Sequence, residues 1–147
     1  MTDKKKEEKA FDKYKQVVDE LTKREDKKGL QLVKELVEKC LNYIRITVEM
    51  ETTIKILRFR EISEEELKAT VSNMDMNKSK AHDLLISQLH LVNRYIFRNN
   101  ILKNNPDEGI FSLGSSNLDN RDIIGDWAYF LVSALYKRGI VKEKYTL

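Results

Sequence analysis

The sequence predicts an all-α fold, a single-domain bundle of four to five helices with one long loop before the last helix. Three observations predict it. The 147 residues include only 5 glycines and 1 proline, so helix breakers are scarce. Hydrophobic residues recur at spacings of three and four along most of the chain. The composition, 41% hydrophobic and 35% charged, is that of one globular domain spanning residues 1–147.

Charge and cysteine content narrow the classes of partner and the compartment. The 27 basic and 24 acidic side chains give a net charge of +3, which predicts no extended surface of one sign and argues against a nucleic-acid partner. The single cysteine, Cys40, excludes an intrachain disulfide, and no hydrophobic signal segment follows the start. We therefore expect a cytoplasmic protein. No hydrophobic run reaches the roughly 18 residues that a membrane span needs, so no membrane association is expected.

The first half of the chain predicts two helices. Residues 1–10 form a charged run that we expect to be frayed, and the helical stripe begins at Phe11. A second stripe over about 30–60 predicts a helix of about 30 residues. Its members are Leu36, Cys40, Tyr43, Met50, Ile54 and Leu57. The alternating segment "YIRITVEM" leaves a β-hairpin open for residues 44–59, although no turn-forming residue lies near "METT".

The second half contains clear helix-start signals. Ser63 and Glu66 form a capping box, which predicts a short helix ending at about 73–77, in "NMDMN". Asn77 can cap a further helix that runs to about Arg98 and is hydrophobic nearly all round. We expect a long loop over 99–117.

The last helix is predicted from a cap at Asp119 or Asn120 to Arg138. Gly139 follows at the position where a helix end favours the left-handed conformation.

The pair His82-Asp83 raises the question of a metal site. It resembles part of the motif of the HD phosphohydrolases, and Asp122 or Asp126 could supply the distant acid. That motif also needs an upstream histidine, and the other histidine, His90, comes after the pair. Without that histidine, a His-Asp-Asp set is two or three ligands short of a stable metal site. We therefore predict a packed His82 and a surface Asp83, with no metal ion, cofactor or catalytic residue.

A polar cluster between the last two long helices is the candidate site. A glycine inside a helix, here Gly125, costs up to about 1 kcal/mol relative to alanine and indicates close approach of another helix or a ligand. The cluster comprises His82, Asp83, Asn93, Arg94, Gly125, Asp126 and Trp127. It is interpreted first as a structural hydrogen-bond network, and alternatively as a ligand pocket. Cys40 falls on a hydrophobic stripe, which indicates an inert core residue.

Two segments, "AHDLLISQLHLVNRYIF" and "RDIIGDWAYFLVSALYKRG", resemble the signature segments of a small bacterial family of short helical proteins with no assigned function. The resemblance covers the C-terminal half of the chain. It implies a cytosolic bacterial protein in which the His-Asp and Gly-Asp-Trp segments meet.

The leading hypothesis is a non-enzymatic helical protein that acts through interaction with another protein or through self-association as a homodimer. It depends on surplus hydrophobic surface, which a bundle this small does not cover. One alternative is a small-molecule or metal-binding enzyme that uses His82, Asp83, Arg94 and Asp126. The other is a nucleic-acid-associated regulator. A helix-turn-helix could turn at "NMDMN", but the helix after it is too hydrophobic to lie in a DNA groove.

Overall fold

The computed structural model describes residues 2–102 and 120–142, and these residues form an all-α bundle of four helices. The helices are α1 (Asp3–Lys23), α2 (Lys27–Arg58), α3 (Glu64–Arg98) and α4 (Arg121–Lys137). The predicted fold class is confirmed. Most of the predicted loop at 99–117 lies outside the described residues. None of the helices in the described ranges is long and hydrophobic enough to cross a membrane.

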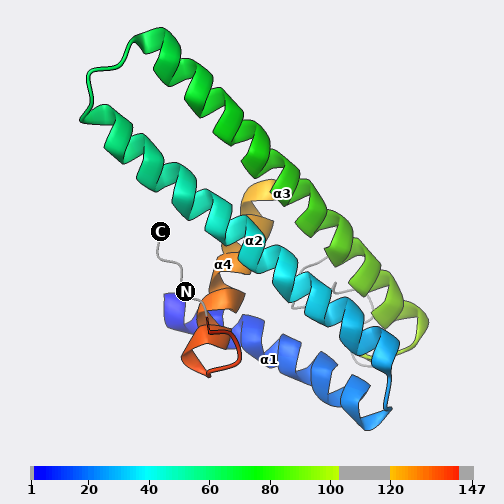
Figure 1. Ribbon diagram of the computed structural model, residues 1–147. Helices are drawn as coiled ribbons and strands as arrows, with labels where there is room; N and C mark the ends of the chain where they lie inside the picture. Colours follow the sequence, from blue (N-terminus) through cyan, green and yellow to red (C-terminus); the bar gives the residue numbers. More distant parts are fainter. Residues whose placement is uncertain (1, 103–119, 143–147) are drawn as a thin grey trace.

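The two longest helices, α2 and α3, form an antiparallel hairpin that organises the molecule (Figure 1). The lower part of the hairpin packs against α1 and α4, and we call this part the base. The upper part projects beyond both of these helices (Figure 1). Because α1 and α4 lie on one side of the hairpin, its opposite side, which we call the front face, carries no other described helix.

The hydrophobic core lies entirely in the base and takes side chains from all four helices. Its largest fully buried members are Val17, Leu21, Leu36, Cys40, Ile44, Leu85, Leu89, Val92, Ile124, Leu131 and Leu135. Burial raises the pKa of the Cys40 thiol, so this side chain stays protonated and inert, as its place on a hydrophobic stripe predicts.

The helix predicted over 30–60 is confirmed, and the hairpin alternative for residues 44–59 is excluded. Tyr43, Ile44 and Thr47 are all buried on one side of α2. The hydroxyl of Thr47 donates to the carbonyl of Tyr43 at 2.9 Å, which satisfies its polar group inside the helix. The alternating hydrophobic residues therefore lie on two sides of a helix and do not form a strand.

The break predicted at 73–77 is wrong, because α3 runs without interruption from Glu64 to Arg98. "NMDMN" holds neither glycine nor proline, and its asparagine and aspartate weaken a helix by only about 0.7 kcal/mol each or less. Packing against α2 is enough to offset that. The Ser63 cap is confirmed, since its hydroxyl accepts from the backbone N–H of Glu66 at 3.1 Å. The turn that a helix-turn-helix would need is therefore absent from this segment.

The chain is helical from Asp3, whereas the sequence predicts a frayed start over residues 1–10. Glu7 explains the difference: its side chain is buried and accepts a hydrogen bond from Lys137 of α4 at 2.7 Å. Ala10, one turn further on, is also buried. The charged run therefore packs one side on α4, a contact that its local composition does not reveal.

The end of the base is closed by hydrogen bonds between α1, α2 and α3. Asp26 caps α2 by accepting from the backbone N–H of Gly29 at 3.0 Å, and it accepts from the hydroxyl of Tyr95 on α3 at 2.6 Å. Arg24 donates to the carbonyl of Asn99 at 2.6 Å, just after α3 ends. These hydrogen bonds hold the end of α1, the start of α2 and the end of α3 together.

Candidate functional site

The predicted His-Asp pair lies midway along α3, where α2, α3 and α4 meet. His82 is buried, and its ring centroid lies 4.6 Å from that of Tyr43 on α2. Tyr43 in turn packs on Gly125 of α4, where an added Cβ would lie 2.9 Å from the tyrosine hydroxyl oxygen. The predicted close approach at Gly125 is thus made by another helix of the same chain.

Asp83 points to the surface. It forms an ion pair with Arg121 at 2.9 Å, and the side chain of Asp83 is 63% exposed. Arg121 also donates to the backbone carbonyl of Ser79 at 3.2 Å. An exposed pair of this kind contributes less than about 1 kcal/mol, so it orients α4 more than it stabilises the fold. The pair is therefore a packed histidine beside a surface aspartate.

The ring of His82 is held in its neutral form. Burial lowers its pKa, and the positive charge of Arg121 lowers it further. Its Nε2 atom is buried and has no hydrogen-bond partner among the described residues. Burial also raises the pKa of Tyr43, so both rings are uncharged near neutral pH. Two stacked neutral rings are suited to packing three helices together.

We expect the stability of the protein to fall as pH drops from 7 to 5 through His82. Its pKa is lower in the folded protein than the ordinary 6.5, so the unfolded chain binds the proton first and acid favours unfolding. His82→Phe should flatten this part of the profile. Thermal midpoints at several pH values would show a difference on the order of a few degrees. Equal slopes in the wild type and the variant would contradict the assignment.

The seven residues of the predicted cluster do not all meet. Asn93 and Arg94 lie eleven and twelve residues beyond His82 on the same helix, which places them about 16 to 18 Å away. Trp127 is buried in the core of the base. His82, Asp83 and Gly125 do come together, and Asp126 lies near enough to Tyr43 to raise its pKa. In the described part of the chain, no three His, Cys, Asp or Glu side chains are placed to share a metal ion.

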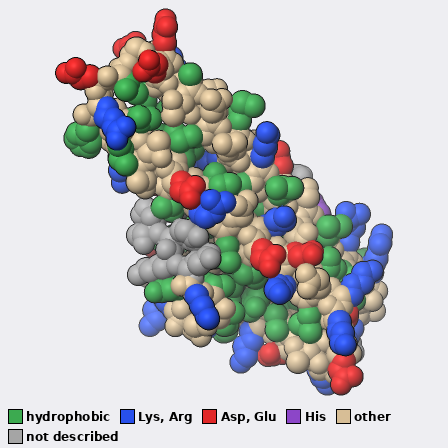
Figure 2. Space-filling view, in the orientation of Figure 1, with side chains coloured by type: hydrophobic (Ala, Val, Ile, Leu, Met, Phe, Trp, Pro, Cys, Tyr) green, Lys and Arg blue, Asp and Glu red, His purple; other side chains and the backbone are tan. Residues whose placement is uncertain are grey.

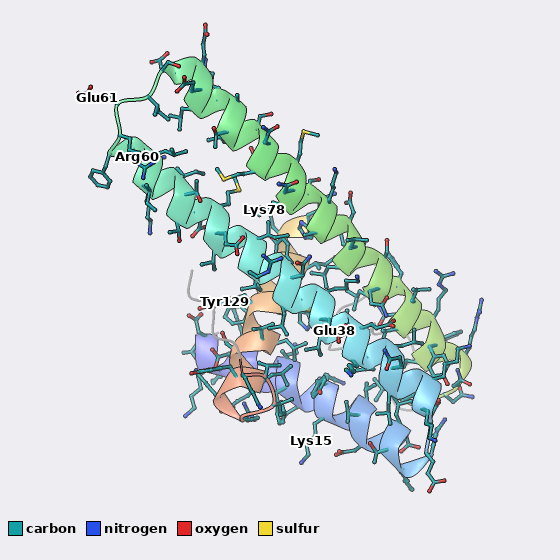
Figure 3. All side chains as sticks on the ribbon, in the orientation of Figure 1. Lys15, Glu38, Arg60, Glu61, Lys78 and Tyr129 are labelled. Carbon is teal, nitrogen blue, oxygen red and sulfur yellow. The ribbon has the colours of Figure 1, made fainter. Side chains whose placement is uncertain are left out.

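The projecting part of the hairpin, residues 48–80, is a surface that the predicted site residues do not include; we call it the arm. None of its side chains is buried. It nevertheless carries many hydrophobic residues: Val48, Met50, Ile54, Ile56, Leu57, Phe59, Ile62, Leu67, Val71, Met74 and Met76. Phe59 is 92% exposed, Met76 56% and Ile56 48%. Figure 3 labels Arg60 and Glu61 at the tip of the arm, far from Tyr129 on α4.

A groove of about 460 Å³ lies between α2 and α3 where the arm leaves the base. Its lining includes Ile46 and Met50 from α2, and Ala81 and Leu84 from α3. Figure 2 shows hydrophobic side chains gathered in patches along the hairpin, with charged side chains around them. Lys80 also lines the groove, so the groove offers hydrophobic contacts beside a positive charge.

Sequence comparison finds a family but no characterised relative. No curated protein matches the chain. A family model described as "Protein of unknown function (DUF3232)" matches residues 1–139, which extends well beyond the C-terminal half where the signature segments lie. The chain therefore belongs to this family of proteins of unknown function.

Proposed function

We propose that this is a non-enzymatic cytoplasmic protein that acts by protein–protein interaction, with the arm as its binding surface. One observation carries the proposal: from Val48 to Lys80 no side chain is buried, although hydrophobic residues recur throughout. In the base, α1 and α4 cover the same two helices and produce a closed core. Among the described residues the arm has no such cover, apart from a partial contact of Val48 with the core and the hydrogen bond from Arg121 to Ser79 at its lower end.

The physical reason is the geometry of a two-helix hairpin. Two helices bury one seam between them, and the hydrophobic residues beside that seam stay in contact with water. Leu57 and Leu67 remain half-exposed for this reason, and Phe59 at the tip is almost fully exposed. A projecting hydrophobic surface rimmed by charges is typical of an interaction site. His82, a residue of the candidate cluster, packs against Tyr43 of the neighbouring helix.

We expect a photo-crosslinking amino acid at position 59 to capture a protein partner in cells that naturally produce the protein. The same group at position 140 is the control, because Ile140 is 49% exposed but lies after α4, away from the arm. Adducts detected on denaturing gels at position 59 and not at 140 would support the proposal. If neither position yields an adduct, or both yield the same ones, the arm is not the binding surface.

A further inference from the structure

We propose that the occupant of the arm is a second copy of this chain, packed antiparallel on the front face of the hairpin. This inference rests on the proposed function and names its partner. Two arms, each of two helices, would form a four-helix bundle around a two-fold axis perpendicular to the arms. In that arrangement α2 lies beside its symmetry mate, α3 beside its own mate, and all neighbouring helices are antiparallel, which suits their dipoles.

The charges on the front face of α3 are self-complementary in this arrangement. Glu66, Thr70, Asn73, Asn77 and Lys80 recur at spacings of three and four, so they share one face of the helix. Asn77 and Lys80 line the groove, which identifies that face as the front one. Glu66 precedes Asn73 by seven residues and Lys80 follows it by seven. A two-fold axis at Asn73 therefore places each Glu66 opposite the Lys80 of the other copy.

These two charges are available for such a contact. Both side chains are exposed, and neither forms an ion pair within residues 2–102 and 120–142. A parallel pairing would instead bring glutamate to glutamate and lysine to lysine. The order of charges along α3 thus favours the antiparallel pairing of two identical helices over the parallel one.

The exposed hydrophobic residues follow the same symmetry. Ile62 precedes Asn73 by eleven residues, and Leu84 follows it by eleven. The axis therefore brings the tip of each arm over the groove of the other copy, where Leu84 is 49% exposed. Phe59, at 92% exposure, would enter that region and lose its contact with water.

The area is sufficient for a stable dimer. The overlap from Ile62 to Leu84 spans about 22 residues, or roughly 33 Å at 1.5 Å per residue. Two adjacent helices, each about 10 Å across, make this face roughly 20 Å wide. The product, roughly 660 Å² for each copy, lies within the roughly 600–1,000 Å² that a standard specific interface buries on each partner.

Charge reversal tests the pairing directly. Glu66→Lys gives two lysines on each front face and Lys80→Glu gives two acids, so each variant should repel itself. We expect each reversal to raise the dimer Kd about tenfold to a hundredfold at low salt, measured by sedimentation equilibrium on the full chain. An equimolar mixture of the two variants restores both opposite-charge pairs and should form a heterodimer as tight as the wild-type dimer. The double variant should also dimerise like wild type.

Lys68→Glu is the matched control, since Lys68 is exposed on α3 but points away from the front face, half a helical turn from Asn77. It should leave the dimer Kd unchanged. Equal thermal midpoints at concentrations below the Kd would show that the variants fold. A wild-type chain that stays monomeric up to its solubility limit would overturn the inference, and so would variants that fail to complement. If position 59 still crosslinks to a different protein in that case, the proposed function stands; if it captures nothing, both fail.

Discussion

Replacing Ile124 with alanine should lower the free energy of unfolding by about 3 kcal/mol, within the 2–5 kcal/mol typical of such truncations. Ile124 lies in the first turn of α4 and is fully buried between this helix and the hairpin. The truncation removes hydrophobic contact and leaves a cavity that a close-packed core does not readily fill. Urea denaturation of the variant, with the slope of the transition unchanged, would measure the loss.

The neighbouring residue supplies the control. Ile123 is 38% exposed, so Ile123→Ala removes the same atoms from a position partly in contact with water. Its cost should stay below about 1 kcal/mol. Equal losses at the two positions would contradict the placement of α4, because a helix rotated by one residue would exchange the burial of the two isoleucines.

A second large effect is expected at Gly125, where leucine should cost about 3 kcal/mol by overpacking. An added Cβ would lie 2.9 Å from the hydroxyl oxygen of Tyr43 and 3.4 Å from its ring. The ring has little room to swing aside, because the ring of His82 packs against it with the centroids 4.6 Å apart. Leucine would therefore push α4 away from the hairpin. Thermal unfolding, with near-ultraviolet circular dichroism to follow the tyrosine environment, would detect both consequences.

A double-variant cycle separates this clash from the general cost of changing a helix. Gly125→Ala should destabilise the wild-type background, because the clash exceeds the gain of up to about 1 kcal/mol that alanine brings to a helix. In a Tyr43→Phe background the hydroxyl is gone, so the same change should become neutral or stabilising. Additive effects in the two backgrounds would show that the Tyr43 contact does not determine the choice of glycine.

Local signals made several elements predictable from the sequence. Ser63 and Asn120 cap their helices through bonds to backbone amides three residues ahead, which short-range patterns encode. Gly139 has φ 71°, the left-handed conformation that glycine adopts readily. The stripe that predicts one helix in place of a hairpin also succeeded, because it continues over many turns.

The errors and omissions concern contacts between residues far apart in the chain. The break predicted at 73–77 failed because α2 supports α3 along its whole length. The buried Glu7 depends on Lys137, and the seating of Tyr43 on Gly125 joins helices that lie far apart in the chain. An exposed hydrophobic surface was expected from the sequence. However, the spacing of hydrophobic residues does not show which turns of a helix pack against another helix. The arm could therefore be located only from the packed structure.

Because the turn between α2 and α3 is exposed, the length of the hairpin can change without changing the packing of the base. Val48 packs partly against the core and Ser79 contacts Arg121, but no residue from Val48 to Lys80 has a buried side chain, so the core does not depend on where the chain reverses. Because seven residues come close to two full helical turns, adding or deleting seven in each helix would keep every face in register. Such a change would alter the reach of the protein in steps of about 10 Å while the base keeps its sequence.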